Sequence, residues 1–130
     1  RSGLRLVDLG SGSAPYRPLF QPLTDAYVTV DSNPLHSANV VAAPDGRAFV
    51  NPTGNAGMAS GGTGDVLTGI LGGLLAQRLD PLDAACVGVW AHGAAGDRAA
   101  GDSDGRGLAA RDLIADLPRV LRRLAALRET

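Results

Sequence analysis

Residues Asn51 to Asp65 read NPTGNAGMASGGTGD, a stretch rich in glycine. Directly after it the apolar residues follow helical spacing, at Val66, Leu67, Ile70, Leu71, Leu74 and Leu75. The first N–H groups of a helix have no partner within the helix, and the helix dipole adds positive potential there. Glycines at this point let an anion approach those amides closely. The stretch therefore predicts a phosphate-binding loop that opens a helix.

The residues of GGTGD have separate expected roles. Gly61, Gly62 and Gly64 leave space for the anion, while Thr63 either caps the helix or offers its hydroxyl to a phosphate oxygen. Asp65 lies in the first turn, where a carboxylate would repel a bound phosphate. Such a carboxylate makes sense if it accepts the proton of a substrate hydroxyl that attacks the phosphate, so Asp65 is predicted to be a catalytic base. The alternative is a tight turn followed by a helix-start charge.

Upstream of the loop the pattern favours strands. Leu4 to Leu9 is a short apolar run that ends at a Gly-Ser-Gly turn, and Ala26 to Val30 is rich in β-branched residues. Between them, Pro15 to Leu23 has room for one or two helical turns. Val40 to Ala43 and Ala48 to Val50 flank a Pro-Asp-Gly-Arg turn and predict a β-ribbon.

Downstream of the loop the chain reads as three helices. The first starts at Asp65, and we expect another backbone to approach its glycines closely, at Gly69, Gly72 and Gly73. Asp80 is a good N-cap for a second helix that runs to about Ala100. The residues from 101 to 107 form a linker, and a third amphipathic helix follows.

Composition narrows the function classes. The chain has 130 residues, enough for one domain, and its formal net charge of −1 leaves no electrostatic footprint for nucleic acid or an anionic membrane. The single cysteine, Cys86, excludes an internal disulfide and a multi-cysteine metal site, which favours a reducing cytoplasm. No apolar run is long enough to span a membrane, and the first residues do not look like a signal peptide.

The second part of the chain resembles a known family. The string VVAAPDGRAFVNPTGNAGMASGGTGDVLTGILGGLLAQRLDPLDAACVGVWAHGAAGD, followed by GLAARDLIADLP, resembles the C-terminal part of the NAD(P)H-hydrate dehydratases. These are ADP- or ATP-dependent lyases of the ribokinase-like superfamily. The resemblance implies a nucleotide site at Asn55 to Gly64 and a catalytic aspartate at Asp65. It also implies Mg²⁺ with the phosphates, and hydrated NADH or NADPH as substrate for nicotinamide nucleotide repair.

The first part of the chain resembles something else. LVDLGSGSAPYRPLF and YVTVDSNP, within residues 1–34, are similar to the opening of a class I S-adenosylmethionine-dependent methyltransferase. The resemblance would place Asp8, Gly10 and Gly12 near the methionine part and Asp31 near the ribose. The rest of such an enzyme is missing, so we expect these residues to act as a packing unit. The seam is expected between Pro34 and Asn39, which divides a chimeric chain into residues 1–38 and 39–130.

The predicted fold is α/β, with a small sheet of two Rossmann-like strands plus a β-ribbon packed against three C-terminal helices, a partial ribokinase-like arrangement. The members of this family are longer than the matching stretch, so the dehydratase hypothesis includes the case of an incomplete or inactive fragment. The alternatives are an S-adenosylmethionine-binding methyltransferase fragment and an inert structural domain. An oligomer is compatible with the sequence. His92 and Asp97 are expected to make structural hydrogen bonds, and Trp90 and Cys86 are expected to belong to the core.

Overall fold

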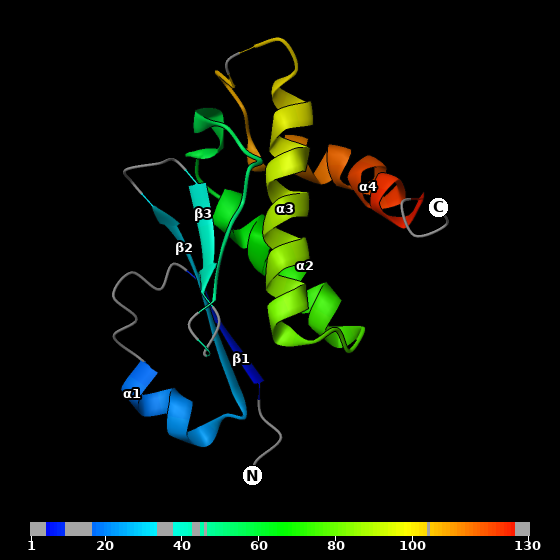
Figure 1. Ribbon diagram of the computed structural model, residues 1–130. Helices are drawn as coiled ribbons and strands as arrows, with labels where there is room; N and C mark the ends of the chain where they lie inside the picture. The colour runs from blue at the N-terminus through cyan, green and yellow to red at the C-terminus, as the bar shows by residue number, and fades with distance from the viewer. Residues whose placement is uncertain are drawn as a thin grey trace.

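We describe the protein from a computed structural model, in which residues 5–9, 17–33, 38–42, 45, 47–103 and 105–126 are described. Within these residues four strands form one sheet, and three long helices lie beside it (Figure 1). The strands are β1 (Arg5–Leu9), β2 (Ala26–Asn33), β3 (Ala38–Ala42) and β4 (Ala48–Val50). The helices are α1 (Arg17–Phe20), α2 (Thr63–Ala76), α3 (Pro81–Ala100) and α4 (Ala110–Ala126), with 3₁₀ turns η1 (Gln21–Leu23) and η2 (Ala56–Met58).

The sheet has the order β1-β2-β3-β4. β1 and β2 pair in parallel, with Val7 opposite Val28, and the short α1 and η1 lie between them in the sequence. β3 pairs antiparallel with both β2 and β4, so that Val41 stands opposite Val30 on one side and Phe49 on the other. The sheet thus combines a parallel pair with an antiparallel ribbon, as the sequence pattern predicts.

A charged turn closes the ribbon. The backbone N–H and the Nε of Arg47 donate to the two carboxylate oxygens of Asp45 over 3.1 and 2.8 Å. The hydrogen bonds from the Arg47 backbone and side chain lower the pKa of Asp45 below its ordinary value. Arg47 also lies 5.7 Å from the centre of the Phe49 ring on β4. The turn therefore holds its end of β4 through side-chain contacts.

Helix α3 is the centre of the fold. One side packs on the sheet, where Ala85 and Val89 meet Val28 and Val41 in a buried cluster. The other side packs on α4 and the segment before it, where the buried residues are Ala91, Ala95, Leu108, Leu113 and Val120. Figure 1 shows α3 standing between the sheet and α4. Burial of each large apolar side chain in these clusters contributes roughly 1.5–3 kcal/mol to the free energy of unfolding. Because α3 belongs to both clusters, it holds the sheet and α4 together.

The expectation about the glycines of α2 is wrong for the described residues. A Cβ placed at Gly69, Gly72 or Gly73 would meet no atom within 4 Å, because this face of α2 is exposed. Close approach occurs on α3 instead. A Cβ at Gly93 would lie 2.7 Å from the Thr53 carbonyl carbon, and one at Gly88 would overlap the Leu71 side chain. The glycines of α3 therefore allow close packing: Gly93 against the Thr53 backbone and Gly88 against Leu71 of α2.

Some predicted features lie outside the described residues. These are the turn at 10–12, the residues 34–37 of the expected seam, and Pro44 and Gly46 of the hairpin turn. Asp8 and Asp31 lie in strands, but their side chains are also outside the description. Among the helices that the structure describes, none has the length and apolar character to cross a membrane.

Candidate functional site: the glycine loop at the start of α2

The segment that leads into the glycine loop is fastened to the side of α3. Asn51 is buried at the end of β4, and its amide Nδ2 donates to Thr53 O over 2.9 Å and to Val89 O over 3.3 Å. The Thr53 hydroxyl lies 2.8 Å from Asn51 Oδ1 and 3.0 Å from Trp90 O, with one hydrogen to share between them. The two α3 carbonyls are within reach because Gly93 has no side chain to keep Thr53 away. The NPTGN backbone is thereby fixed against one turn of α3.

Asp97 fastens the next two residues. Its carboxylate accepts one hydrogen bond from Gly54 N over 2.9 Å and another from Asn55 Nδ2 over 3.0 Å. The Asn55 carbonyl oxygen Oδ1 accepts from Gly57 N over 3.0 Å and so caps η2. Asp97 therefore pairs with its neighbours, as expected. Asn55, predicted to bind the nucleotide, has both side-chain polar atoms engaged in holding the loop.

Helix α2 starts two residues earlier than predicted, at Thr63. Gly62 is its N-cap and adopts φ +89°, a left-handed conformation that favours glycine. The Thr63 hydroxyl makes no capping bond; it points inward, 2.7 Å from Met58 O and 2.9 Å from Ser60 O, and the residue is 7% exposed. The predicted capping role of Thr63 is therefore wrong, because the hydroxyl closes the loop on itself.

His92 holds the start of α2 against α3. Its Nε2 lies 2.9 Å from Thr63 O and donates to that carbonyl, so the imidazole carries a hydrogen on Nε2. Burial lowers the pKa of His92 below the ordinary histidine value, although the bond to Thr63 acts in the opposite direction. The other ring nitrogen, Nδ1, is buried and has no partner among the described residues. The predicted hydrogen-bonded structural role is confirmed.

The loop leaves a set of backbone donors unused. Within the described residues no acceptor is found for the N–H groups of Gly61, Gly62, Gly64 and Asp65. A Cβ at Gly61 or Gly64 would meet nothing within 4 Å, so the space before these amides is open. Free amides at a helix N-terminus, with the dipole behind them, make a ready site for phosphate or carboxylate oxygens.

Asp65 stands at the edge of this set of amides. It is exposed in the first turn of α2, and its carboxylate accepts no hydrogen bond from the residues described. A free carboxylate next to an anion site can accept a proton from a group that reacts with the anion. No cluster of three or more potential metal ligands occurs in the described part of the chain. The structure thus brings Asp65, Gly61, Gly62 and Gly64 together at one surface.

The sequence pattern does not predict which residues hold the loop in place. Asn51 and Thr53 belong to the quoted motif, yet only the structure shows that both bond to carbonyls of α3. The spacing of Gly93 and Gly96, one turn apart on α3, was the available signal, because small residues at that spacing favour close approach. Trp90, expected in the core, is half-buried and packs against a buried cluster, as Cys86 packs against the other.

In the solved structure of the ADP/ATP-dependent NAD(P)H-hydrate dehydratase of Bacillus subtilis co-crystallised with ATP and Mg²⁺, 92% of this chain superposes with a TM-score of 0.68 and 30% identity. That coverage exceeds residues 39–130, so part of the N-terminal segment superposes too. The chain therefore has part of the ribokinase-like α/β fold of these dehydratases.

The sequence comparison points the same way. Residues 35–119 match the profile of the family described as NAD(P)H-hydrate dehydratase. The bifunctional NAD(P)H-hydrate repair enzyme Nnr of Moorella thermoacetica is 54% identical over 91 residues, which is 70% of this chain and 17% of that protein. The ADP-dependent (S)-NAD(P)H-hydrate dehydratase of Bacillus subtilis is 43% identical over 84 residues, 65% of this chain and 30% of that protein. The chain belongs to the NAD(P)H-hydrate dehydratase family.

The match is partial along the relatives. The chain spans 17% of the Moorella enzyme, 30% of the Bacillus dehydratase and 47% of the dehydratase chain crystallised with ATP and Mg²⁺. The comparisons support the dehydratase part of the sequence interpretation, and none of them shows the methyltransferase resemblance of residues 1–34.

Proposed function

We propose that the glycine loop binds the phosphates of ADP or ATP and that Asp65 is the base of an ADP/ATP-dependent NAD(P)H-hydrate dehydratase. The observation that carries the proposal is a set of four N–H groups, at Gly61, Gly62, Gly64 and Asp65, that have no acceptor among the described residues and lie beside a carboxylate equally without a partner there. Amides in this arrangement fit phosphate oxygens, and the open space at Gly64 admits them. The named activity of the relatives supports the choice of nucleotide and of substrate.

Asp65 would act on the substrate hydroxyl. The hydrated nicotinamide ring of NADH or NADPH carries this hydroxyl, whose oxygen attacks the terminal phosphorus while the carboxylate takes the proton. The nucleotide leaves with one phosphate fewer, and loss of phosphate from the ring, together with a proton from the neighbouring ring carbon, then restores the double bond. The loop amides hold the oxygens on which charge is spread during transfer.

Mg²⁺ would accompany the nucleotide. In phosphate sites this ion is bound through one or two carboxylates together with phosphate oxygens and water, so a dedicated cluster of protein ligands is not required. The described residues contain no such cluster, and Asp65 is the acidic group nearest in sequence to the free amides. When bound, the ion would neutralise part of the phosphate charge.

Turnover of hydrated NADH with ADP or ATP and Mg²⁺ tests the catalytic part. Asp65→Asn should reduce the rate about a hundredfold or more, because an amide of the same shape accepts no proton. Asp83→Asn is the matched control, since Asp83 is the acidic residue in the first turn of α3 and loses the same helix-dipole interaction. Equal rates for Asp65→Asn and Asp83→Asn would refute the assignment of the base, as would the absence of turnover in the unchanged chain.

S-adenosylmethionine serves as the competing ligand in a thermal-shift measurement. A ligand that binds only the folded state raises the melting temperature. ADP or ATP with Mg²⁺ should raise it more than S-adenosylmethionine does. A rise in melting temperature with S-adenosylmethionine alone would favour the methyltransferase hypothesis over the dehydratase hypothesis and point to residues 1–34.

A further inference from the structure

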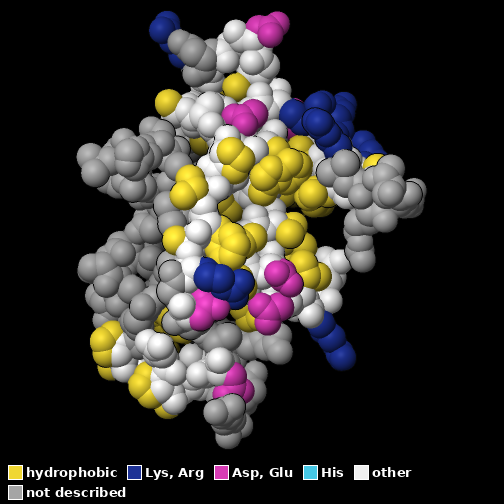
Figure 2. All heavy atoms as spheres, in the orientation of Figure 1, with side chains coloured by type: hydrophobic (Ala, Val, Ile, Leu, Met, Phe, Trp, Pro, Cys, Tyr) yellow, Lys and Arg dark blue, Asp and Glu magenta, His cyan; other side chains and the backbone are white. Residues whose placement is uncertain are grey.

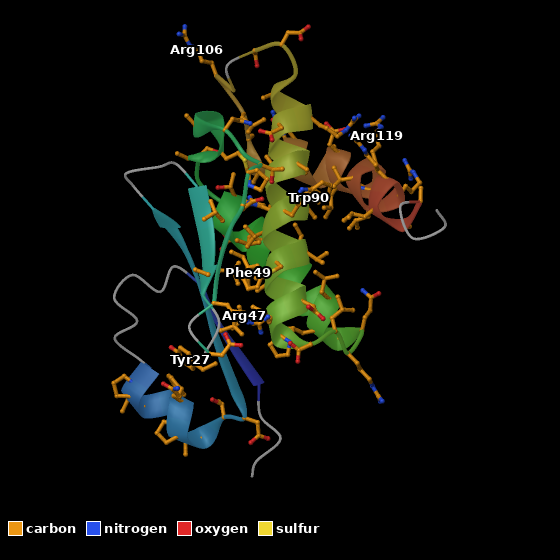
Figure 3. All side chains as sticks on the ribbon, in the orientation of Figure 1. Tyr27, Arg47, Phe49, Trp90, Arg106 and Arg119 are labelled. Atoms are coloured by element: carbon orange, nitrogen blue, oxygen red, sulfur yellow. The ribbon has the colours of Figure 1, made fainter. Side chains whose placement is uncertain are left out.

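A second recess lies away from the glycine loop. A cavity of about 250 Å³ opens between α3 and α4, beside the NPTGN segment. Its apolar lining comes from Trp90 and Ala94 on α3 and from Val120 on α4. Figure 3 shows Trp90 on α3 and Arg119 on the neighbouring α4. Thr53 of the NPTGN segment lines this cavity, whereas none of the residues from Asn55 to Gly64, predicted for the nucleotide site, does.

Three arginines surround the apolar part, namely Arg98, Arg119 and Arg123. Figure 2 shows basic side chains gathered over α4 next to hydrophobic ones. Arg98 and Arg119 share a single carboxylate, that of Asp116, at 3.6 and 2.8 Å. Arg123 has no ion pair or hydrogen bond among the residues described.

Among the described residues, the carboxylates of Asp97, which lines the cavity, and of Asp116 offset two of these three positive charges, so one positive charge remains in excess. Both oxygens of Asp97 already accept hydrogen bonds, from Gly54 N and from Asn55 Nδ2. The cavity is therefore apolar within and cationic at its rim. Guanidinium groups match the planar fork of carboxylates and phosphates, and the half-buried Trp90 offers apolar surface for a ring.

We propose that this cavity is a binding site for a small aromatic oxyanion, a single planar ring that carries a phosphate or a carboxylate. The ring packs against Trp90 and Ala94, and the acid group lies against Arg123 with Arg119 beside it. A cavity of this volume is smaller than the usual range for drug-sized ligands, roughly 300–1,000 Å³, which favours a compact molecule over a dinucleotide. The site is separate from the proposed function and does not rest on it.

Trp90 makes the site directly measurable because it is the single tryptophan of the chain. The probes are phenyl phosphate and benzoate, which distinguish the two kinds of acid group. Inorganic phosphate supplies charge without a ring, and benzyl alcohol supplies a ring without charge. We expect a saturable change in tryptophan fluorescence with at least one of the aromatic acids and a much weaker response to both controls.

Matched variants locate the binding. Arg123→Gln should weaken binding of the aromatic acid about tenfold or more, as expected for loss of a hydrogen bond between charged groups. Arg122→Gln is the control, because Arg122 is the adjacent exposed arginine on α4 and does not line the cavity. Both positions are exposed, and circular dichroism checks that each variant folds. Gly64→Val should leave binding unchanged.

The proposal is overturned by any of three results: no saturable response to either aromatic acid, equal losses in Arg123→Gln and Arg122→Gln, or loss of binding in Gly64→Val. The last result would assign the acid to the glycine loop instead. Should Arg123→Gln fail to fold, Arg119→Gln replaces it in the same comparison. A tenfold loss in that variant supports the site, and an unchanged affinity overturns it.

Discussion

Asn55 Nδ2 donates a hydrogen bond to Asp97 Oδ1 over 3.0 Å, which joins residues 42 positions apart in the sequence. The other carboxylate oxygen of Asp97 accepts from Gly54 N over 2.9 Å. One charged side chain of α3 therefore holds two consecutive residues of the loop at fixed distances. The glycine loop follows within a few residues, so its position depends on α3 as well as on α2.

The two hydrogen bonds to Asp97 predict a loss of stability when this carboxylate is replaced. In Asp97→Asn one acceptor becomes a donor that faces Asn55 or Gly54, and we expect the free energy of unfolding to fall by about 1 kcal/mol, since both bonds are exposed to solvent. Asp102→Asn, in the exposed segment after α3, is the control and should change stability by less than about 0.5 kcal/mol. Urea unfolding measures both. Similar values for the two variants would show that Asp97 does not fix the loop.

A pair of glycine substitutions tests how the loop lies on α3. Gly93→Ala should destabilise the protein by about 1–3 kcal/mol, because its Cβ would come within 2.7 Å of the Thr53 backbone. Gly72→Ala meets nothing within 4 Å and should stabilise α2 by up to about 1 kcal/mol through helix propensity. Opposite signs in thermal unfolding are the expected outcome. A stabilising Gly93→Ala would mean that the NPTGN backbone does not lie against α3.

The inward hydroxyl of Thr63 gives a third prediction. Thr63→Val keeps the shape of the side chain and leaves Met58 O and Ser60 O without this donor, which should cost about 1–3 kcal/mol of stability. Thr68→Val is the matched control, because the exposed Thr68 hydroxyl bonds, among the described residues, to Gly64 O of its own helix. Chemical denaturation distinguishes the two. If Thr63→Val is the milder change, the hydroxyl does not close the loop.

His92 makes stability depend on pH. Burial lowers its folded-state pKa, whereas the unfolded chain has the ordinary value of 6.5. Below pH 6.5 the unfolded state therefore binds more protons, and stability falls as the pH drops from 6.5 toward the lowered pKa. His92→Gln retains a donor for Thr63 O and cannot titrate, so its stability should change less between pH 7.5 and pH 5.5. Parallel losses in the two proteins would exclude His92 as the cause.

Local signals in the sequence were sufficient for much of the fold. The periodic apolar residues after Asp65 predict α2, and Asp80 does cap α3 by accepting from Leu82 N over 3.0 Å. Both depend on contacts within a few residues, which a sequence pattern records. The parallel and antiparallel strand pairs also follow from short apolar runs and a turn.

Contacts between segments far apart in the sequence could not be predicted from these local patterns. The glycines of α2 and α3 look alike in sequence, yet only those of α3 meet another segment, because the tertiary fold decides which helix face is covered. Threonine is a common N-cap residue, but Gly62, in a left-handed conformation, is the N-cap of α2 in place of Thr63. The cationic cavity depends on Arg98 and Arg123 of two helices, and no local motif brings them together.

Calorimetric titration of ADP and ATP, each with Mg²⁺, measures whether the free amides at the start of α2 bind phosphate. Gly64→Val places carbon where the space before those amides is now open, and Gly72→Val makes the same change at an equally open position of the same helix. We expect saturable binding to the unchanged chain, a loss of affinity of about tenfold or more in Gly64→Val, and an unchanged affinity in Gly72→Val. Equal affinity in Gly64→Val and the unchanged chain, or no binding of either nucleotide, would contradict this expectation.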